Sequence, residues 1–115
     1  LDADPVADRF GPDVVRVMYE NYLGTAVDNA PLAAVPGQAS VADLAHFPPT
    51  LMINGDTDEL RVSGEVFAHT LTEAGRDITV LTEQGPQHGH LNRPDEPAAS
   101  LSIARIAEHL RALRA

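Results

Sequence analysis

The stretch Thr50-Leu51-Met52-Ile53-Asn54 is a short apolar run that lies between Pro48-Pro49 and Gly55. A run of this length between turn residues predicts a strand that is buried on both faces. A second run, Ile78-Thr79-Val80-Leu81-Thr82, is rich in β-branched residues, which favour strands. The sequence therefore predicts two strands separated by a segment that is long enough to hold a helix.

The segments that follow the two strands have helical spacing. In the first, Ser63 is the expected N-cap and Gly75 the glycine that ends the helix. In the second, Asp95-Glu96-Pro97 predicts a helix start. The first apolar face comprises Val66, Phe67, Thr70, Leu71 and Ala74. The second, the expected inner face of the last helix, comprises Ile103, Ile106, Ala107, Leu110 and Leu113. Strand, helix, strand, helix predicts an α/β fold with parallel strands over residues 50–115.

Residues 1–49 differ in composition, because they hold six of the nine prolines. They predict loops around one helix, which starts at Gly11-Pro12-Asp13 and ends at Gly24. A short helical turn is expected from Ser40 to Leu44. We therefore divide the chain into a helix-and-loop segment, 1–49, and a βαβα unit, 50–115.

Composition excludes several classes of function. Seventeen acids against eight bases give a net charge of −9, which argues against nucleic acid and anionic membrane surfaces as partners. The chain has no cysteine, so thiol catalysis, disulfides and cysteine-ligated zinc are excluded. Its glycines are isolated and form no phosphate-binding loop, and we expect no cofactor and no metal.

The predicted topology brings polar side chains to one edge of the sheet. Asp56 and Asp58 follow the first strand, and His88 and His90 follow the second. Parallel strands end at the same edge, where open α/β folds place their ligand sites. The sequence therefore predicts that an acid and an imidazole meet there.

At these positions the chain resembles the α/β-hydrolases, and among them the hormone-sensitive-lipase-like esterases and lipases. The resemblance implies that Asp58 orients the catalytic histidine and that His88 is the general base. It also implies a small acyl-ester substrate and places the helix Tyr19–Leu23 near the acyl-binding pocket. The matching stretches are Phe47-Pro48-Pro49-Thr50-Leu51-Met52, Gly55-Asp56-Thr57-Asp58-Glu59-Leu60-Arg61, Gly64-Glu65-Val66-Phe67-Ala68, Leu71-Thr72-Glu73-Ala74-Gly75 and Gly85-Pro86-Gln87-His88-Gly89-His90.

The chain departs from the family pattern in its nucleophile. Neither the G-x-S-x-G segment of the serine elbow nor an H-G-G-G segment for the oxyanion hole occurs in the 115 residues. We therefore expect both to lie upstream of Leu1, so that this chain is the C-terminal portion of a hydrolase and is inactive alone. His90 stands where the family usually has an aromatic residue, and Val62 where an acid is common.

Other interpretations of the same residues remain open at this point. His90 could be the base in place of His88, and Asp56 is expected to be a turn or cap residue. His88, His90 and Asp58 could form a site of two histidines and one carboxylate for a metal. His69 is expected on a solvated helix face. The whole chain could instead be a non-catalytic α/β module that serves in binding or assembly.

The sequence also predicts self-association. Two strands alone make a marginal sheet. The strand at Leu51–Ile53 is expected to have an unpaired edge, and such edges pair readily with other chains. We therefore expect a homodimer or higher oligomer with contacts through the Thr50–Asn54 strand.

Overall fold

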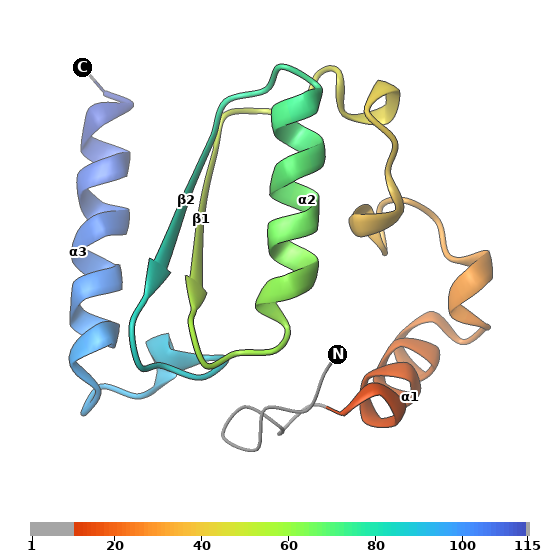
Figure 1. Ribbon diagram of the computed structural model, residues 1–115, viewed down its shortest axis with the longest axis horizontal. Coiled ribbons are helices and arrows are strands. Elements are labelled where there is room, and N and C mark those ends of the chain that lie inside the picture. The colour runs from red at the N-terminus through yellow and green to blue at the C-terminus, as the bar shows by residue number, and fades with distance from the viewer. Residues whose placement is uncertain (1–10, 115) are drawn as a thin grey trace.

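The computed structural model describes residues 11–114 of the chain. Its centre is a parallel pair of strands, β1 (Thr50–Gly55) and β2 (Ile78–Glu83), with Thr50 opposite Ile78 and Gly55 opposite Glu83. The helices α2 (Arg61–Glu73) and α3 (Pro97–Ala112) lie on either side of this pair (Figure 1). The predicted α/β class and the parallel order of the strands are confirmed.

The expectation of a fully buried first strand is wrong for the described residues. Residues 50–54 are only half-buried, and Gly55 alone in β1 is buried. The reason is that the described part of the chain forms a sheet of two strands, so each strand has a neighbour on one side.

Helix α2 begins two residues before its expected cap. Asp58 Oδ1 accepts a hydrogen bond from the Leu60 amide at 2.9 Å, which ends the preceding turn and lets the helix start at Arg61. Ser63 lies inside the helix, and its hydroxyl donates to the Leu60 carbonyl at 2.9 Å. Leu71 is completely buried, and Gly75 ends the helix with φ +70° as expected.

Helix α3 begins at Pro97 as predicted, but it buries a different face. Its buried side chains are Ala99 and Ser102, whereas Ile103, Leu110 and Leu113 of the expected inner face are 55–63% exposed. Small side chains let this helix approach β1 and the short 3₁₀ helix η4 (His90–Asn92) closely. The larger apolar side chains therefore face outward from the described part of the chain.

Helix α1 (Pro12–Leu23) has the predicted bounds and ends at Gly24, where φ is +69°. Within residues 11–114 none of its side chains is buried, and Val14, Met18 and Tyr22 are all more than half exposed.

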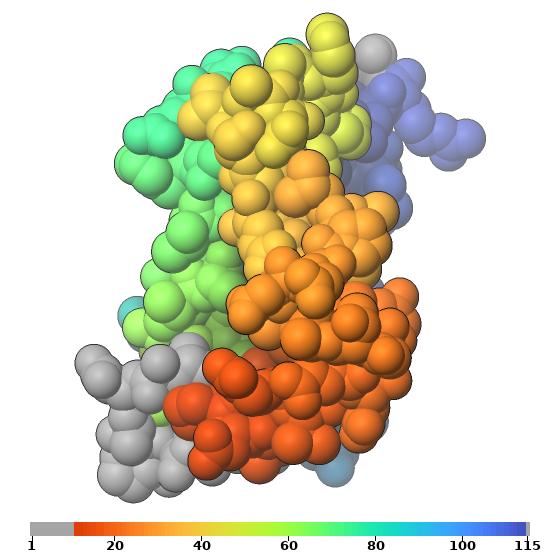
Figure 2. Space-filling view, turned by 90° about the vertical axis from the view of Figure 1, so that its right-hand side faces the viewer, coloured from red at the N-terminus to blue at the C-terminus, as the bar shows by residue number. Residues whose placement is uncertain are grey.

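Three short 3₁₀ helices follow α1, and the last confirms the turn expected after Ser40: η1 (Val27–Asn29), η2 (Pro36–Gln38) and η3 (Ala42–Leu44). Residues 11–49 form a strip, red to yellow in Figure 2, that runs beside α2. At its end, Phe47 makes an edge-to-face ring contact with Phe67 at 5.5 Å between centroids, and its carbonyl accepts a hydrogen bond from Arg76 Nε at 2.7 Å. Among the described residues, no helix has the length and apolar character needed to cross a membrane.

Candidate active site

The loops that follow β1 and β2 lie at one edge of the sheet, beyond the arrowheads in Figure 1. There, Oδ2 of Asp58 and Nδ1 of His88 are 2.8 Å apart. The Asp58 side chain is 9% exposed and that of His88 is 51% exposed. The structure therefore brings together the acid and the imidazole that the sequence placed at this edge.

Both oxygens of the Asp58 carboxylate are engaged. Oδ1 accepts from the Leu60 amide, and Oδ2 faces His88. An ionised carboxylate can only accept hydrogen bonds, so Nδ1 is the donor in the pair and the ring is fixed in one tautomer. This is the arrangement in which Nε2 takes up a proton while the carboxylate stabilises the imidazolium that forms.

The two loops are also joined directly by their backbones and by two side chains. Asp56 Oδ1 accepts from the Gly85 amide at 2.7 Å, and the Asp56 amide donates to the Glu83 carbonyl at 3.0 Å. The Thr57 hydroxyl donates to the Gly85 carbonyl at 3.1 Å. Gly55 packs so closely on Pro86 that a Cβ there would overlap the Pro86 carbonyl oxygen. The loops of Asp58 and His88 thus form one connected unit.

His90 has a different partner. Its Nε2 lies 2.8 Å from Ser102 Oγ, and both residues are buried. This hydrogen bond ties η4 to α3 just after His88 in the chain. The structure therefore does not bring His90 to Asp58, and in residues 11–114 no cluster of three His, Asp or Glu side chains is arranged to hold a metal ion.

Among the buried polar residues of this region that the sequence analysis missed, two link separate elements. One is Ser102, whose signal is a small polar residue inside the apolar pattern of α3. The other is Glu83, which is 4% exposed and forms an ion pair with Arg105 of α3 at 2.7 Å. An acid that directly follows an apolar strand is the available signal for Glu83, because a buried carboxylate needs a partner.

A cavity of about 350 Å³ opens at the Asp58–His88 pair. A second cavity, of about 440 Å³, lies beside it, is largely apolar and includes Leu60, which lines both. Helix α1 contributes most of the second lining, including Tyr19 and Tyr22. Helix α1, which the resemblance placed near an acyl pocket, thus lines a cavity that shares Leu60 with the cavity at Asp58 and His88.

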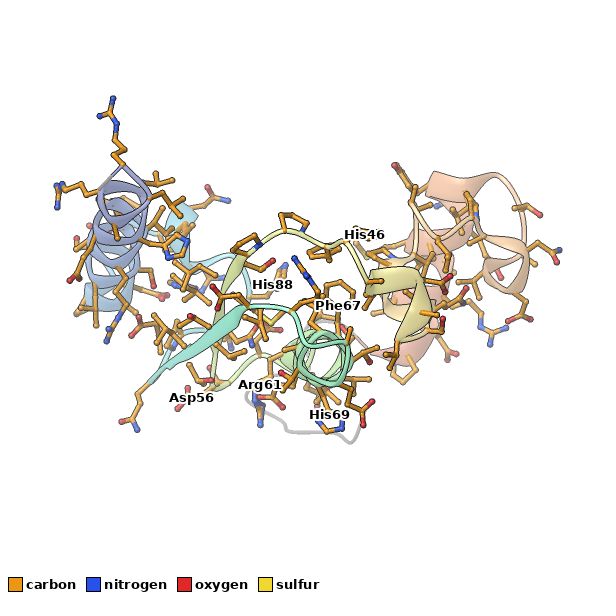
Figure 3. The ribbon with its side chains drawn as sticks, turned by 90° about the horizontal axis from the view of Figure 1, so that it is seen from above. His46, Asp56, Arg61, Phe67, His69 and His88 are labelled. Carbon is orange, nitrogen blue, oxygen red and sulfur yellow. The ribbon has the colours of Figure 1, made fainter. Side chains whose placement is uncertain are left out.

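Other histidines lie away from this edge. His69 is on the outer side of α2, where its side chain is 74% exposed and contacts Glu73 at 3.2 Å, as expected for a solvated face (Figure 3). His46 is exposed in the loop before β1.

The chain is similar in sequence and fold to known proteins. The sequence model of the alpha/beta hydrolase fold family matches residues 3–92. An esterase from the fungus Rhizomucor miehei aligns with 89% of this chain at 31% identity and a TM-score of 0.80. Carboxyl esterase 2 from the mycorrhizal fungus Tuber melanosporum aligns with 84% at 28% identity and a TM-score of 0.74. A Pyrobaculum calidifontis esterase aligns with 95% at 27% identity and a TM-score of 0.63. No curated protein sequence matches the chain significantly.

The chain belongs to the α/β-hydrolase fold family, and its structural relatives are esterases. The aligned region covers 32% of the Rhizomucor chain, 33% of the Tuber chain and 40% of the Pyrobaculum chain. The chain therefore spans about a third of the length of the first two, a share that fits the C-terminal portion of an α/β-hydrolase.

Proposed function

We propose that this chain carries the acid and the base of a serine carboxylic-ester hydrolase, with Asp58 as the orienting acid and His88 as the general base. The hydrogen bond of 2.8 Å between Asp58 Oδ2 and His88 Nδ1, two residues that line the same cavity, carries the proposal. The esterases with which the chain aligns support the reaction class.

The serine nucleophile would come from residues outside these 115. Within the chain, the hydroxyls of Ser40, Ser63 and Ser102 hydrogen-bond to Asp43, Leu60 and His90. None of the chain's serines stands in a G-x-S-x-G segment. The 115 residues alone are therefore expected to be inactive in ester hydrolysis.

The proposed reaction uses His88 twice. Its Nε2 takes the proton of the serine hydroxyl as that oxygen attacks the ester carbonyl, and the Asp58 carboxylate stabilises the resulting imidazolium. The same nitrogen then gives the proton to the leaving alcohol. In the second step His88 activates water, which releases the acid. The apolar cavity beside Leu60 suits a small or medium acyl group.

The first test is the reading frame that precedes Leu1. The proposal expects a G-x-S-x-G segment within about 150 codons upstream of Leu1, since the serine precedes the acid and the histidine in this fold. In the chain extended to include it, p-nitrophenyl acetate and butyrate should be hydrolysed, and a fluorophosphonate probe should label the upstream serine. A stop codon or an unrelated domain would instead favour the non-catalytic binding or assembly module.

Variants of the extended chain then assign the roles. Asp58→Asn should lower kcat by roughly 10⁴ because it disturbs the tautomer of His88, and His88→Ala should cost at least as much. Measured on the folded fraction, His90→Ala should be mild, because His90 bonds to Ser102 and not to Asp58. If His90→Ala is the crippling change, or if the probe labels the 115-residue chain, the assignment is wrong.

We also infer that a polypeptide of these 115 residues associates with a second copy. The supporting features are a sheet of two strands in the described region and the exposed side chains Ile103, Leu110 and Leu113. Size exclusion with light scattering should give a dimer or a larger species. A monomer of 12.3 kDa with a cooperative melt would overturn this inference.

A further inference from the structure

Asp56 lies between the two loops that carry Asp58 and His88. Its carboxylate is on the first loop, and the amide that it binds, that of Gly85, is on the second. The distance of 2.7 Å from Oδ1 to the Gly85 nitrogen matches that between Asp58 and His88 to within 0.1 Å. Both hydrogen bonds join the same two loops, and the partners in each are about 30 residues apart in the sequence.

We propose that Asp56 is a positioning residue, which acts through the Gly85 amide to hold His88 at hydrogen-bonding distance from Asp58. This inference rests on the proposed function of the Asp58–His88 pair. Asp56 stands two residues before Asp58, and Gly85 stands three residues before His88. The hydrogen bond between Asp56 and Gly85 therefore joins the two loops close to the Asp58–His88 contact.

The backbone at both ends of this hydrogen bond is constrained. Gly85 has φ +96°, a conformation that glycine adopts at little cost, and it directs its amide toward Asp56. The Asp56 carbonyl accepts from Arg61 Nη1 at 3.2 Å, and the neighbouring Thr57 hydroxyl bonds the Gly85 carbonyl. A charge-assisted bond from an amide to a carboxylate is stronger than a neutral one, so the link from Asp56 to Gly85 is stronger than the link from Thr57.

The link has a consequence for the state of the His88 ring. With Gly85 held, His88 presents Nδ1 to Asp58, and the neutral ring is protonated at Nδ1. Without the link, the loop of His88 gains freedom and the two tautomers mix. The tautomer is a property of the 115-residue chain itself, so it can be measured without a nucleophile.

The experiment compares His88 in the wild-type chain, Asp56→Ala and Asp56→Asn by ¹⁵N NMR of the ring nitrogens at alkaline pH. In the wild type we expect the Nδ1–H tautomer and a downfield proton resonance from Nδ1–H. Asp56→Ala should lose this resonance and give both tautomers. Asp56→Asn keeps an oxygen that can accept from Gly85, and it should restore most of the wild-type pattern.

A matched control removes a similar hydrogen bond elsewhere. Asp43 Oδ2 accepts from the Ser40 amide at 2.9 Å, far from the site, so Asp43→Ala should leave the His88 spectrum unchanged. If Asp56→Ala retains the Nδ1–H tautomer, or if Asp43→Ala disturbs it equally, the positioning role is refuted. If Asp56→Ala does not fold, the Asp56→Asn spectrum decides. Asn keeps an oxygen that can accept from Gly85, so a mixture of tautomers in this variant would refute positioning through that hydrogen bond.

The same spectra separate this inference from the proposed function. Asp58→Asn should abolish the Nδ1–H tautomer whatever Asp56 does. If the wild type shows no preference for that tautomer, the Asp58–His88 pair itself fails. If the wild type shows it and Asp56→Ala keeps it, only the role of Asp56 fails.

Discussion

Residues 50–112 and residues 12–49 both contain helices with apolar faces, but they bury them very differently. In the first region Ala68, Leu71 and Ala99 are buried together with polar side chains such as Asp58 and His90. In the second region, as the structure describes it, Leu44 is the buried hydrophobic residue. An apolar pattern predicts a helix in both regions, whereas burial also depends on what packs against that helix.

The comparison also separates two kinds of buried group within residues 50–112. Leu71 contributes apolar burial, which stabilises the fold without regard to direction. Asp58, Glu83 and His90 are buried with specific partners, and those partners fix the loops at the carboxyl edge of the sheet. The stability of this region therefore depends mainly on its apolar burial, and the geometry of its candidate site depends on these paired polar side chains.

The largest loss of stability is expected from Leu71→Ala. This change truncates the most completely buried hydrophobic side chain of the described core and leaves a cavity there. We expect a loss of about 2–5 kcal/mol in the free energy of unfolding. The counterpart in residues 12–49 is Met18→Ala, which should change stability by less than about 0.5 kcal/mol because Met18 is 53% exposed. Urea denaturation measures both. Equal losses would show that the two regions do not differ in packing.

A smaller effect is expected from a single methyl group at Gly55. In Gly55→Ala, the Cβ overlaps the Pro86 carbonyl oxygen, and the loops of Asp58 and His88 must move apart. We expect a loss of about 1–3 kcal/mol, the usual cost of overpacking.

Gly37→Ala is the matched change in residues 12–49, where a Cβ meets no atom within 4 Å. It should change stability by less than about 0.5 kcal/mol. Differential scanning calorimetry of the two variants tests this pair. If Gly55→Ala has the same melting temperature as the wild type, the contact between the loops is looser than the structure shows.

Much of the fold could be predicted because its signals are local. The runs at Thr50 and Ile78 have the length and residue types of strands, and Gly24 and Gly75 end helices through backbone conformations that glycine favours. Because parallel strands end at one edge, the meeting of Asp58 and His88 also followed from the topology.

The remaining features depend on tertiary contacts that a sequence pattern does not encode. The inner face of α3 was mispredicted because Ile103 and Leu110 have helical spacing, yet close packing selected the smaller Ala99 and Ser102. Ser63 is a good cap residue, but the side chain of Asp58 ended the preceding turn first. The partner of His90 could not be inferred because it lies on a different element, 12 residues further along the chain.

The smallest expected effect concerns pH and a single turn in residues 12–49. The Ser40 amide, and after it the Ser40 hydroxyl, donates to the Asp43 carboxylate and holds its pKa below the usual value. A lowered pKa means that the folded turn binds fewer protons than the unfolded chain, so its stabilisation is complete above the ordinary aspartate pKa of about 4. It is lost as the pH falls through the lowered value. Because the Asp43 side chain is exposed, the turn should loosen without global unfolding.

NMR titration of the Ser40 amide proton measures this loss directly. We expect its midpoint below the ordinary aspartate value in the wild type, and a shift toward that value in Ser40→Ala, which removes the hydroxyl donor. The amide of Gly85 serves as the internal comparison from residues 50–112, because it donates to a different carboxylate, that of Asp56. If the midpoint for Ser40 does not move in Ser40→Ala, the hydroxyl does not contribute to the turn, and the backbone amide alone accounts for the lowered pKa of Asp43.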